Sequence, residues 1–257
     1  MKTGLFRIAS RALIAVALAV AAGAAAAAEL KVFSTSAFTE IWKELKPKFE
    51  ARGHKLELVL EPSGALNKRI AGGEKGDVIA TVSASLTQLE KSGAAIAVTK
   101  RELASSGMGV AVAKGAARPD ISTPEALKKA LLAARAVAYS DPAGGGASGA
   151  ALAKMLKDMG IEEAINAKAK LGRGISNAEF IIKGEADLAV QQIPELMTVQ
   201  GVDIVGPFPP GLQIRTGFAT AVLAASANLA AARELVDFLA SPETLALLKS
   251  RGFDVKN

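Results

Sequence analysis

The chain has 257 residues, a formal net charge of +6 at pH 7, one histidine and no cysteine. Without thiolates and with a single imidazole, it has few of the ligands that hold transition metals, so no metal and no other cofactor is expected. Aromatic residues make up 4% of the chain and no run of five Lys or Arg residues occurs. This composition argues against nucleic-acid binding.

The N-terminus has the pattern of a secretory signal peptide. Lys2, Arg7 and Arg11 form a basic start, an apolar run of 17 residues follows, and small residues precede Glu29. This pattern predicts export and cleavage after Ala28. An uncleaved membrane anchor is the alternative, because 17 residues is close to the minimum for a spanning helix. Cleavage would lower the net charge to +3, since residues 1–28 carry three basic and no acidic residues.

From residue 29 onward, short apolar runs alternate with amphipathic ones. The first amphipathic run has Ile41, Leu45 and Phe49 on one helical face, and Pro124 marks the first turn of a later helix. Strands are expected over residues 30–34, 54–61, 76–82, 106–115, 135–140, 167–172, 187–192, 202–210 and 216–226. Helices are expected over residues 38–53, 64–73, 85–93, 121–134, 149–160, 177–186 and 228–252, the last broken at Ser241–Pro242.

This alternation predicts an α/β protein with mostly parallel sheets. About ten strands is near the upper limit for one open twisted sheet, which favours two lobes. Strands near Gly107 and Gly217 form a matched pair of crossings, so one lobe is expected over residues 29–107 plus 218–257 and the other over 108–217. Two connecting strands would form a hinge that closes on a ligand. One doubly wound sheet with a helical tail is the alternative.

Four times a strand leads into small or hydroxyl-bearing residues and then into a helix. The four segments are VFSTSAFTEIW, LEPSGALNKRI, AYSDPAGGGASGAALAKM and KLGRGISNAEFII. Each leaves backbone N–H groups at a helix start, where about half a positive elementary charge accumulates and an anion can bind. Side-chain capping is the better explanation for any one of these segments taken alone, but four of them, two in each lobe, favour an anion site. Capping does not explain the three glycines at residues 144–146, which allow a ligand to approach the backbone.

Two enzyme classes fit the sequence poorly. Gly144, Gly146 and Gly149 match the spacing of a dinucleotide-binding loop, but no glycine directly follows the strand and the next strand lacks a terminal acid. A serine hydrolase would have to use His54, which lies in a helix-to-strand turn, and no G-x-S-x-G elbow occurs. The chain is therefore expected not to be an enzyme. An acid or lysine within hydrogen-bond reach of Ser36, Ser63 or Ser148 in a deep pocket would reopen that alternative.

Five segments carry a family resemblance: LKVFSTSAFTEIWKELKPKFE, PSGALNKRIAGGEKGDVIA, AYSDPAGGGASGAALAKML, KGEADLAVQQIPEL and AARELVDFLASPETLALLKSRGF. Together they resemble the periplasmic molybdate-binding family of ABC importers, a type II group of solute-binding proteins. The resemblance implies two α/β lobes, each with a mixed, mostly parallel sheet flanked by helices. It also implies two hinge strands and a small anion bound between the lobes.

Members of that family hold a tetrahedral oxyanion with serines, backbone N–H groups and a tyrosine hydroxyl. The resemblance places the equivalent ligand-binding positions at Ala37, with Ser34 and Ser36 just before it, Ser63 or Gly64, Ser148 with Gly149, Ser176 and Asn177, and Gln192 in the place of the tyrosine.

The resemblance implies a monomeric periplasmic receptor that passes molybdate or tungstate to an ABC permease in the inner membrane. A small organic acid, a di- or tricarboxylate for uptake or sensing, is the alternative ligand. Ala37 and Gln192 lack the hydroxyls of the family, and an amide also suits a carboxylate. Arg173 and Arg215 are expected near the cleft, where a guanidinium would match a carboxylate, although both also fit solvated surface positions. Signalling to a membrane sensor, in place of transport, would use the same closed lobes.

Overall fold

The computed structural model describes residues 27–144 and 147–255, so nearly all of the predicted signal segment lies outside the described residues. Nine strands of the described chain form one hydrogen-bonded set. They are β1 (Glu29–Thr35), β2 (Lys55–Glu61), β3 (Val78–Val82), β4 (Arg101–Ala113), β5 (Val137–Ser140), β6 (Ala169–Gly172), β7 (Leu188–Gln192), β8 (Val202–Pro207) and β9 (Arg215–Val222).

Helices follow most of these strands. They are α2 (Thr39–Glu50), α3 (Ser63–Ala71), α4 (Ser83–Lys91), α5 (Pro124–Ala133), α6 (Ala147–Asp158), α7 (Glu162–Asn166), α8 (Glu179–Ile182), α9 (Ile193–Leu196), α10 (Leu229–Leu239) and α11 (Pro242–Ser250). None of the helices in the described ranges is both long enough and apolar enough to cross a membrane.

The strand order is β2-β1-β3-β9-β4-β7-β5-β6, with β8 also paired to β4. Pairing is parallel near both ends of this order, between β1 and its neighbours β2 and β3 and between β5 and its neighbours β6 and β7. It is antiparallel in the middle, where β9 joins β3 to β4 and β4 continues to β7. The α/β class with a mixed sheet and flanking helices is therefore confirmed; four of the eight strand pairings are parallel and four are antiparallel.

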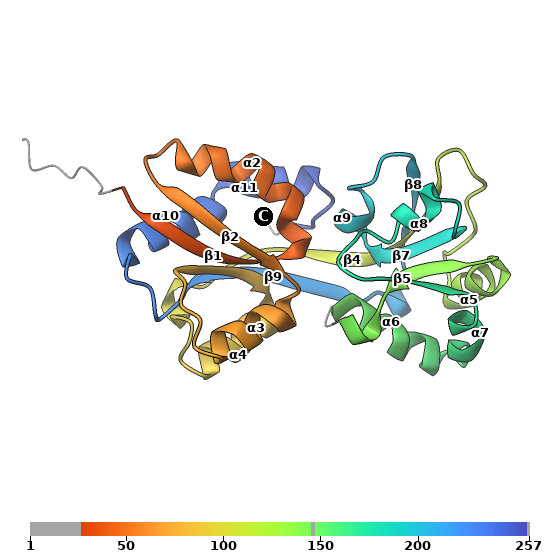
Figure 1. The fold of residues 1–257 in the computed structure, drawn as a ribbon. Coiled ribbons are helices and arrows are strands. Elements are labelled where there is room, and N and C mark those ends of the chain that lie inside the picture. The colour runs from red at the N-terminus through yellow and green to blue at the C-terminus, as the bar shows by residue number, and fades with distance from the viewer. Residues whose placement is uncertain (1–26, 145–146, 256–257) are drawn as a thin grey trace, which may run out of the picture.

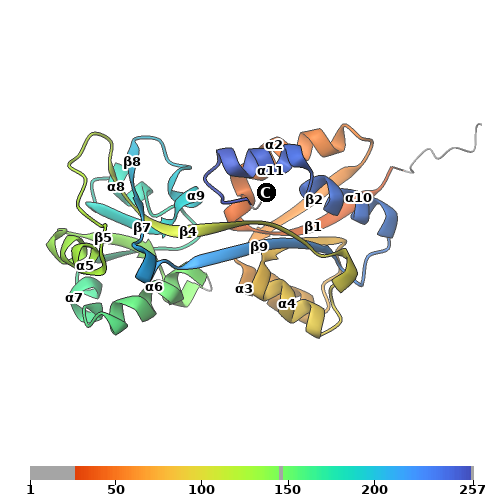
Figure 2. The ribbon, with the colours of Figure 1, turned by 180° about the vertical axis from the view of Figure 1, so that it is seen from behind.

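Strand β4 is shared between the two halves of this arrangement. Residues 101–107 pair with β9, whereas residues 108–113 pair with β7 and β8. Figures 1 and 2 show β4 and β9 running side by side between two groups of helices and strands. We call the group around β1 the β1 body and the group around β7 the β7 body.

Each body has its own apolar core. Two clusters of the β1 body take their buried residues from positions 30–103 and 218–253, and two clusters of the β7 body take theirs from positions 108–208. The helix α2 illustrates why: Ile41, Leu45 and Phe49, spaced four residues apart as predicted, are all buried against the β1 sheet. Such burial of apolar area supplies most of the favourable free energy of folding.

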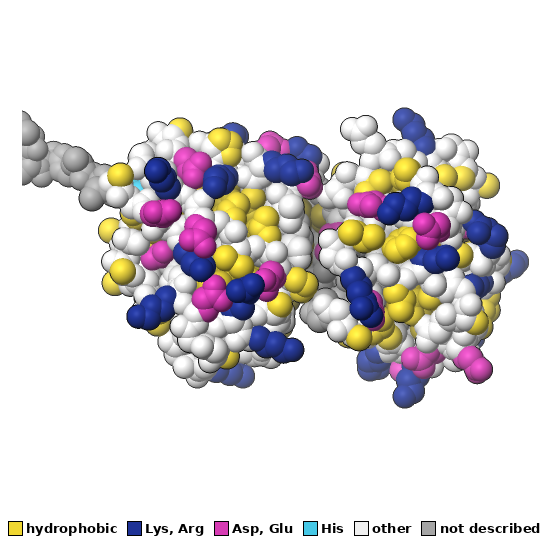
Figure 3. Space-filling view, viewed as in Figure 1, with side chains coloured by type: hydrophobic (Ala, Val, Ile, Leu, Met, Phe, Trp, Pro, Cys, Tyr) yellow, Lys and Arg dark blue, Asp and Glu magenta, His cyan; other side chains and the backbone are white. Residues whose placement is uncertain are grey.

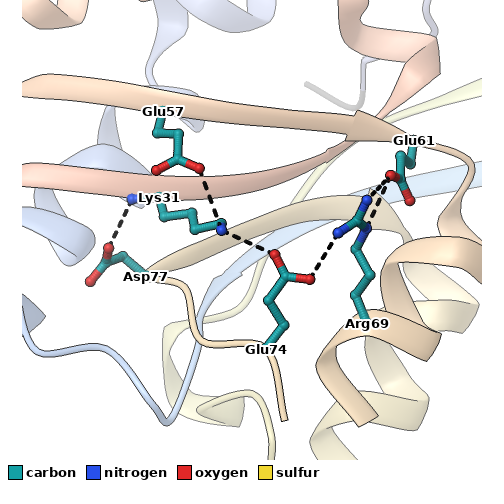
Figure 4. Close-up of polar contacts among 6 residues, drawn as sticks. All are labelled: Lys31, Glu57, Glu61, Arg69, Glu74 and Asp77. Carbon is teal, nitrogen blue, oxygen red and sulfur yellow. Dashed lines mark hydrogen bonds and ion pairs between the residues drawn. The ribbon is translucent and has the colours of Figure 1, made fainter. Parts of the chain in front are cut away.

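A network of charged residues in the β1 body connects β1 and β2 with α3 and the loop that follows it (Figure 4). Lys31 Nζ lies 3.0 Å from Glu74 and 3.4 Å from Glu57, and Arg69 bonds both Glu74 and Glu61. These pairs hold the pKa of the Glu74 carboxyl below its usual range, with the Arg69 hydrogen bond as the largest cause. None of these five residues lines the cavity described below, so the network is a structural feature of this body.

The differences from the sequence expectations lie at element ends. Strand β4 begins at Arg101, before the expected start at residue 106, because it pairs with β9 along its first half. The helix expected over residues 177–186 is limited to α8, and α7 and α9 are additional short helices. Pro124 and Pro242 do open helices, each preceded by a side-chain cap from Thr123 or Ser241.

Candidate functional site

A cavity of about 310 Å³ lies between the two bodies, and the space-filling view shows the gap between them (Figure 3). The strands β1, β2, β5, β6 and β7 all direct their carboxyl ends or the loops that follow them toward it. Ligands of open α/β sheets bind at this edge. Each of the four segments singled out in the sequence contributes wall residues to the cavity.

The wall from the β1 body carries hydroxyl groups. Thr35, Ser36 and Ser63 line the cavity, and their side-chain oxygens make no hydrogen bond to any other described residue. Because no described protein contact holds these three hydroxyls, they can donate to a ligand in the cavity without first breaking one.

The helix starts on this wall keep their backbone donors free of side-chain caps. Phe38 precedes α2 and Pro62 precedes α3, and neither caps its helix through a side chain. Among the described helices, α5 and α11 do have side-chain caps, from Thr123 and Ser241, and both lie away from the cavity. Helix capping therefore does not explain why Ser36 and Ser63 occur in the first two of the four predicted segments.

The wall from the β7 body carries the one cation among the described lining residues, Arg173. Its Nε atom donates to Asp141 Oδ2 at 2.6 Å, and its other nitrogens have no protein partner among the described residues. The Asp141 side chain is 6% exposed, whereas that of Arg173 is 77% exposed. A hydrogen bond from the Ala143 N–H and then the Arg173 guanidinium hold the pKa of the Asp141 carboxyl below its usual range. Asp141 therefore orients the guanidinium and leaves its terminal nitrogens for a ligand.

Ser140 and Ser148 lie beside this pair, with their hydroxyl oxygens 3.5 Å apart. Gly149 is required for this approach, because a Cβ at that position would lie 2.5 Å from the Ser140 carbonyl oxygen. The start of α6 can therefore pack directly on the end of β5, which places Ser148 in the wall.

Two glutamines form the floor at the end of β7. Gln192 accepts a hydrogen bond from the Ser106 hydroxyl and donates to Thr216 Oγ1 at 3.2 Å, which connects β7 with the two crossing strands. Gln191 Oε1 accepts from the Asn177 N–H at 2.7 Å, and its Nε2 donates to Glu195 Oε2. Both glutamine side chains are buried.

Glu195 is the cavity residue with the most perturbed acidity. Burial of its carboxyl raises the pKa to about 7, against a downward effect of the Gln191 hydrogen bond. No Lys, Arg or His side chain of the described residues lies within 4 Å of this carboxyl. The three other carboxylates of the described wall each have a cation: Asp141 pairs with Arg173, Glu40 with Lys43 and Glu179 with Lys183.

Some positions expected at the site lie elsewhere. Ser34 is 0% exposed and accepts a hydrogen bond from Trp42 Nε1 at 2.7 Å, and Arg215 bonds Asp254 and Ser105. Asn177 is fully buried and donates to Ser140 Oγ and the Val190 carbonyl oxygen. None of these lines the cavity, and neither do Gly64 and Gly149. The expected positions that do line it are Ser36, Ala37, Ser63, Ser148, Arg173, Ser176 and Gln192.

Sequence reasoning missed Thr35, Ser140, Asp141, Gln191 and Glu195 as wall residues. Glu195 follows Gln192, the last residue of a buried strand, by three residues, and the sequence alone gives no sign of its burial. The described residues contain no cluster of three His, Cys, Asp or Glu side chains arranged to hold a metal ion. Within the described ranges, no acidic side chain forms a hydrogen bond with the Ser36, Ser63 or Ser148 hydroxyl.

Comparisons with known proteins identify the family of this chain and its fold. The family model for bacterial extracellular solute-binding proteins matches residues 30–254. This chain belongs to that family. Its fold is the type II solute-binding fold of the molybdate-binding kind, as the resemblance implied.

Relatives of this solute-binding protein have different functions. It is 34% identical over 230 residues to an aconitate isomerase of a Pseudomonas species, covering 87% of this chain and 86% of the relative. It is 27% identical over 257 residues to the molybdate-binding protein ModA of Azotobacter vinelandii, covering 96% and 98%. The solved periplasmic molybdate-binding protein of Azotobacter vinelandii superposes with a TM-score of 0.69 at 20% identity, covering 89% of this chain and 100% of the other.

Substitution of Ser34 separates a structural role from ligand contact. In the variant Ser34→Ala the buried Trp42 N–H loses its acceptor, so the free energy of unfolding should fall by about 1–3 kcal/mol. Urea unfolding followed by Trp42 fluorescence measures this, and titration calorimetry should show unchanged ligand affinity. A loss of affinity at unchanged stability would contradict the placement of Ser34 in the core.

Substitution of Glu195 should change how stability depends on pH. The folded-state pKa of about 7 exceeds the ordinary value of 4.5, so the carboxyl destabilises the folded state increasingly as pH rises from 4.5 to 7, and fully above 7. The variant Glu195→Gln cannot ionise. Its melting temperature should therefore exceed that of the wild type by several degrees more at pH 8 than at pH 5, measured by circular dichroism. An equal difference at both pH values would show that the carboxyl is not destabilised by burial.

Proposed function

We propose that this solute-binding protein captures a small polycarboxylate, of the class that includes aconitate, in the cavity between its two bodies. The observation that carries the proposal is the Arg173 guanidinium, which buried Asp141 holds in place and which lines the same cavity as hydroxyls that have no described protein partner. A guanidinium fork matches the two oxygens of a carboxylate. A second carboxylate of the same ligand would then accept hydrogen bonds from the hydroxyls of Thr35, Ser36 and Ser63 and from the helix starts beside them.

Two features favour a polycarboxylate over a tetrahedral oxyanion. The tyrosine hydroxyl implied by the family resemblance is replaced by Gln192, whose amide is engaged with Ser106 and Thr216, and Ala37 has no hydroxyl to offer. The cavity volume of about 310 Å³ is within the range for small organic ligands. The relative named aconitate isomerase also shares more sequence with this chain than the molybdate-binding relative does.

Molybdate or tungstate is the second candidate. The observation in its favour is the group of uncharged donors on the β1 wall, formed by Thr35, Ser36, Ser63 and the N-termini of α2 and α3. A site of this kind can bind an anion without a cation. The molybdate-binding relative covers nearly the whole chain, which supports the same possibility.

Ligand capture would involve closure of the two bodies as lobes. We assign residues 29–107 and 218–257 to one lobe and 108–217 to the other, with β4 and β9 as the hinge. The exported chain, cleaved after Ala28, would act as a monomer in the periplasm and deliver its ligand to an ABC permease. A membrane sensor in place of the permease would use the same closed form.

A calorimetric panel tests the ligand class. The purified mature chain should bind cis- or trans-aconitate or citrate with a clear heat, and should give no comparable signal with molybdate, tungstate or sulfate. The ligand should also raise the melting temperature, because it binds only the folded state. Tight binding of molybdate without binding of any polycarboxylate would refute the proposal and support the second candidate.

Substitution of Arg173 tests whether its guanidinium binds a carboxylate of the ligand. Arg173→Ala removes a charge-assisted hydrogen bond, worth about 1.5–3 kcal/mol, so the Kd for the polycarboxylate should rise about 10- to 150-fold. Arg215→Ala is the matched control, because Arg215 pairs with Asp254 outside the cavity and should leave Kd unchanged. Equal effects of the two substitutions on Kd would argue against a direct contact between Arg173 and the ligand.

A further inference from the structure

We infer that Glu195 transfers a proton between two carbon atoms of the bound acid, so that the cavity isomerises an unsaturated polycarboxylate as well as binding it. This inference rests on the proposed function, because it needs a polycarboxylate in the cavity. It adds a chemical step and a named residue to that binding site.

The first argument is the position of the Glu195 carboxyl. Glu195 lines the cavity from the short helix α9, directly after the end of β7. Its backbone carbonyl oxygen accepts hydrogen bonds from the Ser176 and Thr198 hydroxyls at 2.8 and 2.7 Å. The segment that carries the carboxyl is thus anchored on both sides, which a reacting group requires.

The second argument is the way Gln191 engages one oxygen of this carboxyl. The Asn177 N–H can only donate, so the Gln191 side-chain oxygen faces it and the Gln191 amide nitrogen must face Glu195 Oε2. This donor occupies Oε2 whether the carboxyl is charged or neutral. The other oxygen, Oε1, has no partner among the described residues and is the atom at which a proton can be taken up and released.

The third argument is the charge around the carboxyl. The other titratable side chains of the described cavity wall are Glu40, Asp141, Arg173 and Glu179, and each is already paired. Glu195 lacks a cation that would hold it permanently ionised, and its pKa of about 7 lets it exchange a proton near neutral pH. A general acid–base group works best when its pKa is near the working pH.

The chemistry balances without a cofactor. In an acid such as aconitate, a CH₂ group lies between a carboxylate and a C=C bond. Glu195 in its ionised form takes one proton from this carbon, the C–H electrons form a new C=C bond, and the original π electrons move to the far carbon. The protonated Glu195 then returns its proton to that far carbon, which restores the carboxylate. The negative charge that spreads into the substrate carboxylates in between would be stabilised by Arg173 and the helix starts.

The test uses the purified mature protein with cis- and trans-aconitate, followed by proton NMR in H₂O and in D₂O. The wild type should interconvert the isomers, with a rate at saturation that rises with pH through about 7, as the ionised form of Glu195 accumulates. Glu195→Gln keeps the shape and the Gln191 contact, so calorimetry should show that it binds aconitate while isomerisation falls by at least about 100-fold. Glu185→Gln, an exposed glutamate outside the cavity, is the matched control and should isomerise at the wild-type rate.

The outcomes separate the two proposals. If no polycarboxylate binds the wild type, the proposed function fails. If aconitate binds but the wild type never interconverts its isomers, only the inference fails. If Glu195→Gln isomerises at the wild-type rate, the assignment to Glu195 is wrong. Should that variant not fold, Glu195→Asp takes its place. A folded, aconitate-binding Glu195→Asp protein with an unchanged isomerisation rate would equally overturn the inference.

Discussion

The pairing of β4 with different partners along its length is the constraint on which the cavity depends. Up to Gly107 this strand bonds β9 and belongs to the β1 body, and from Met108 it bonds β7 and β8. Because one strand belongs to both sheets, the edges at which β1, β2, β5, β6 and β7 end face each other across a single gap. Ser106 and Gln192 bond each other close to this change of partner, so the floor of the cavity is part of the same crossing.

The fold was largely predictable because its signals are local. Each strand is indicated by its own apolar run. One helix is indicated by the buried face of Ile41, Leu45 and Phe49, and two helix starts are indicated by the prolines at 124 and 242. None of these signals depends on residues elsewhere in the chain. The early start of β4 was not predictable in this way. Residues 101–105 become a strand because β9, more than a hundred residues later in the chain, pairs with them.

The site was only partly predictable, because a side chain's direction depends on tertiary contacts. Ser34 and Ser36 are two residues apart, yet Trp42 bonds Ser34 in the core while Ser36 reaches the cavity. The Asn177 side chain could donate to a ligand, but it is buried behind the cavity wall. There its side chain donates to Ser140 and its backbone N–H donates to Gln191. Glu195 carries no local signature of reactivity, since its high pKa comes from burial that only the folded chain produces.

The same fold can serve a receptor or an enzyme, and the difference lies in individual side chains of the cavity. Burial of the Glu195 carboxyl works against folding above its pKa, and a glutamine at position 195 would keep the Gln191 contact without that penalty. Stability alone therefore gives no reason for an ionisable group there. Proton transfer gives one, because only a group that is ionised in one step and neutral in the next can move a proton along the ligand.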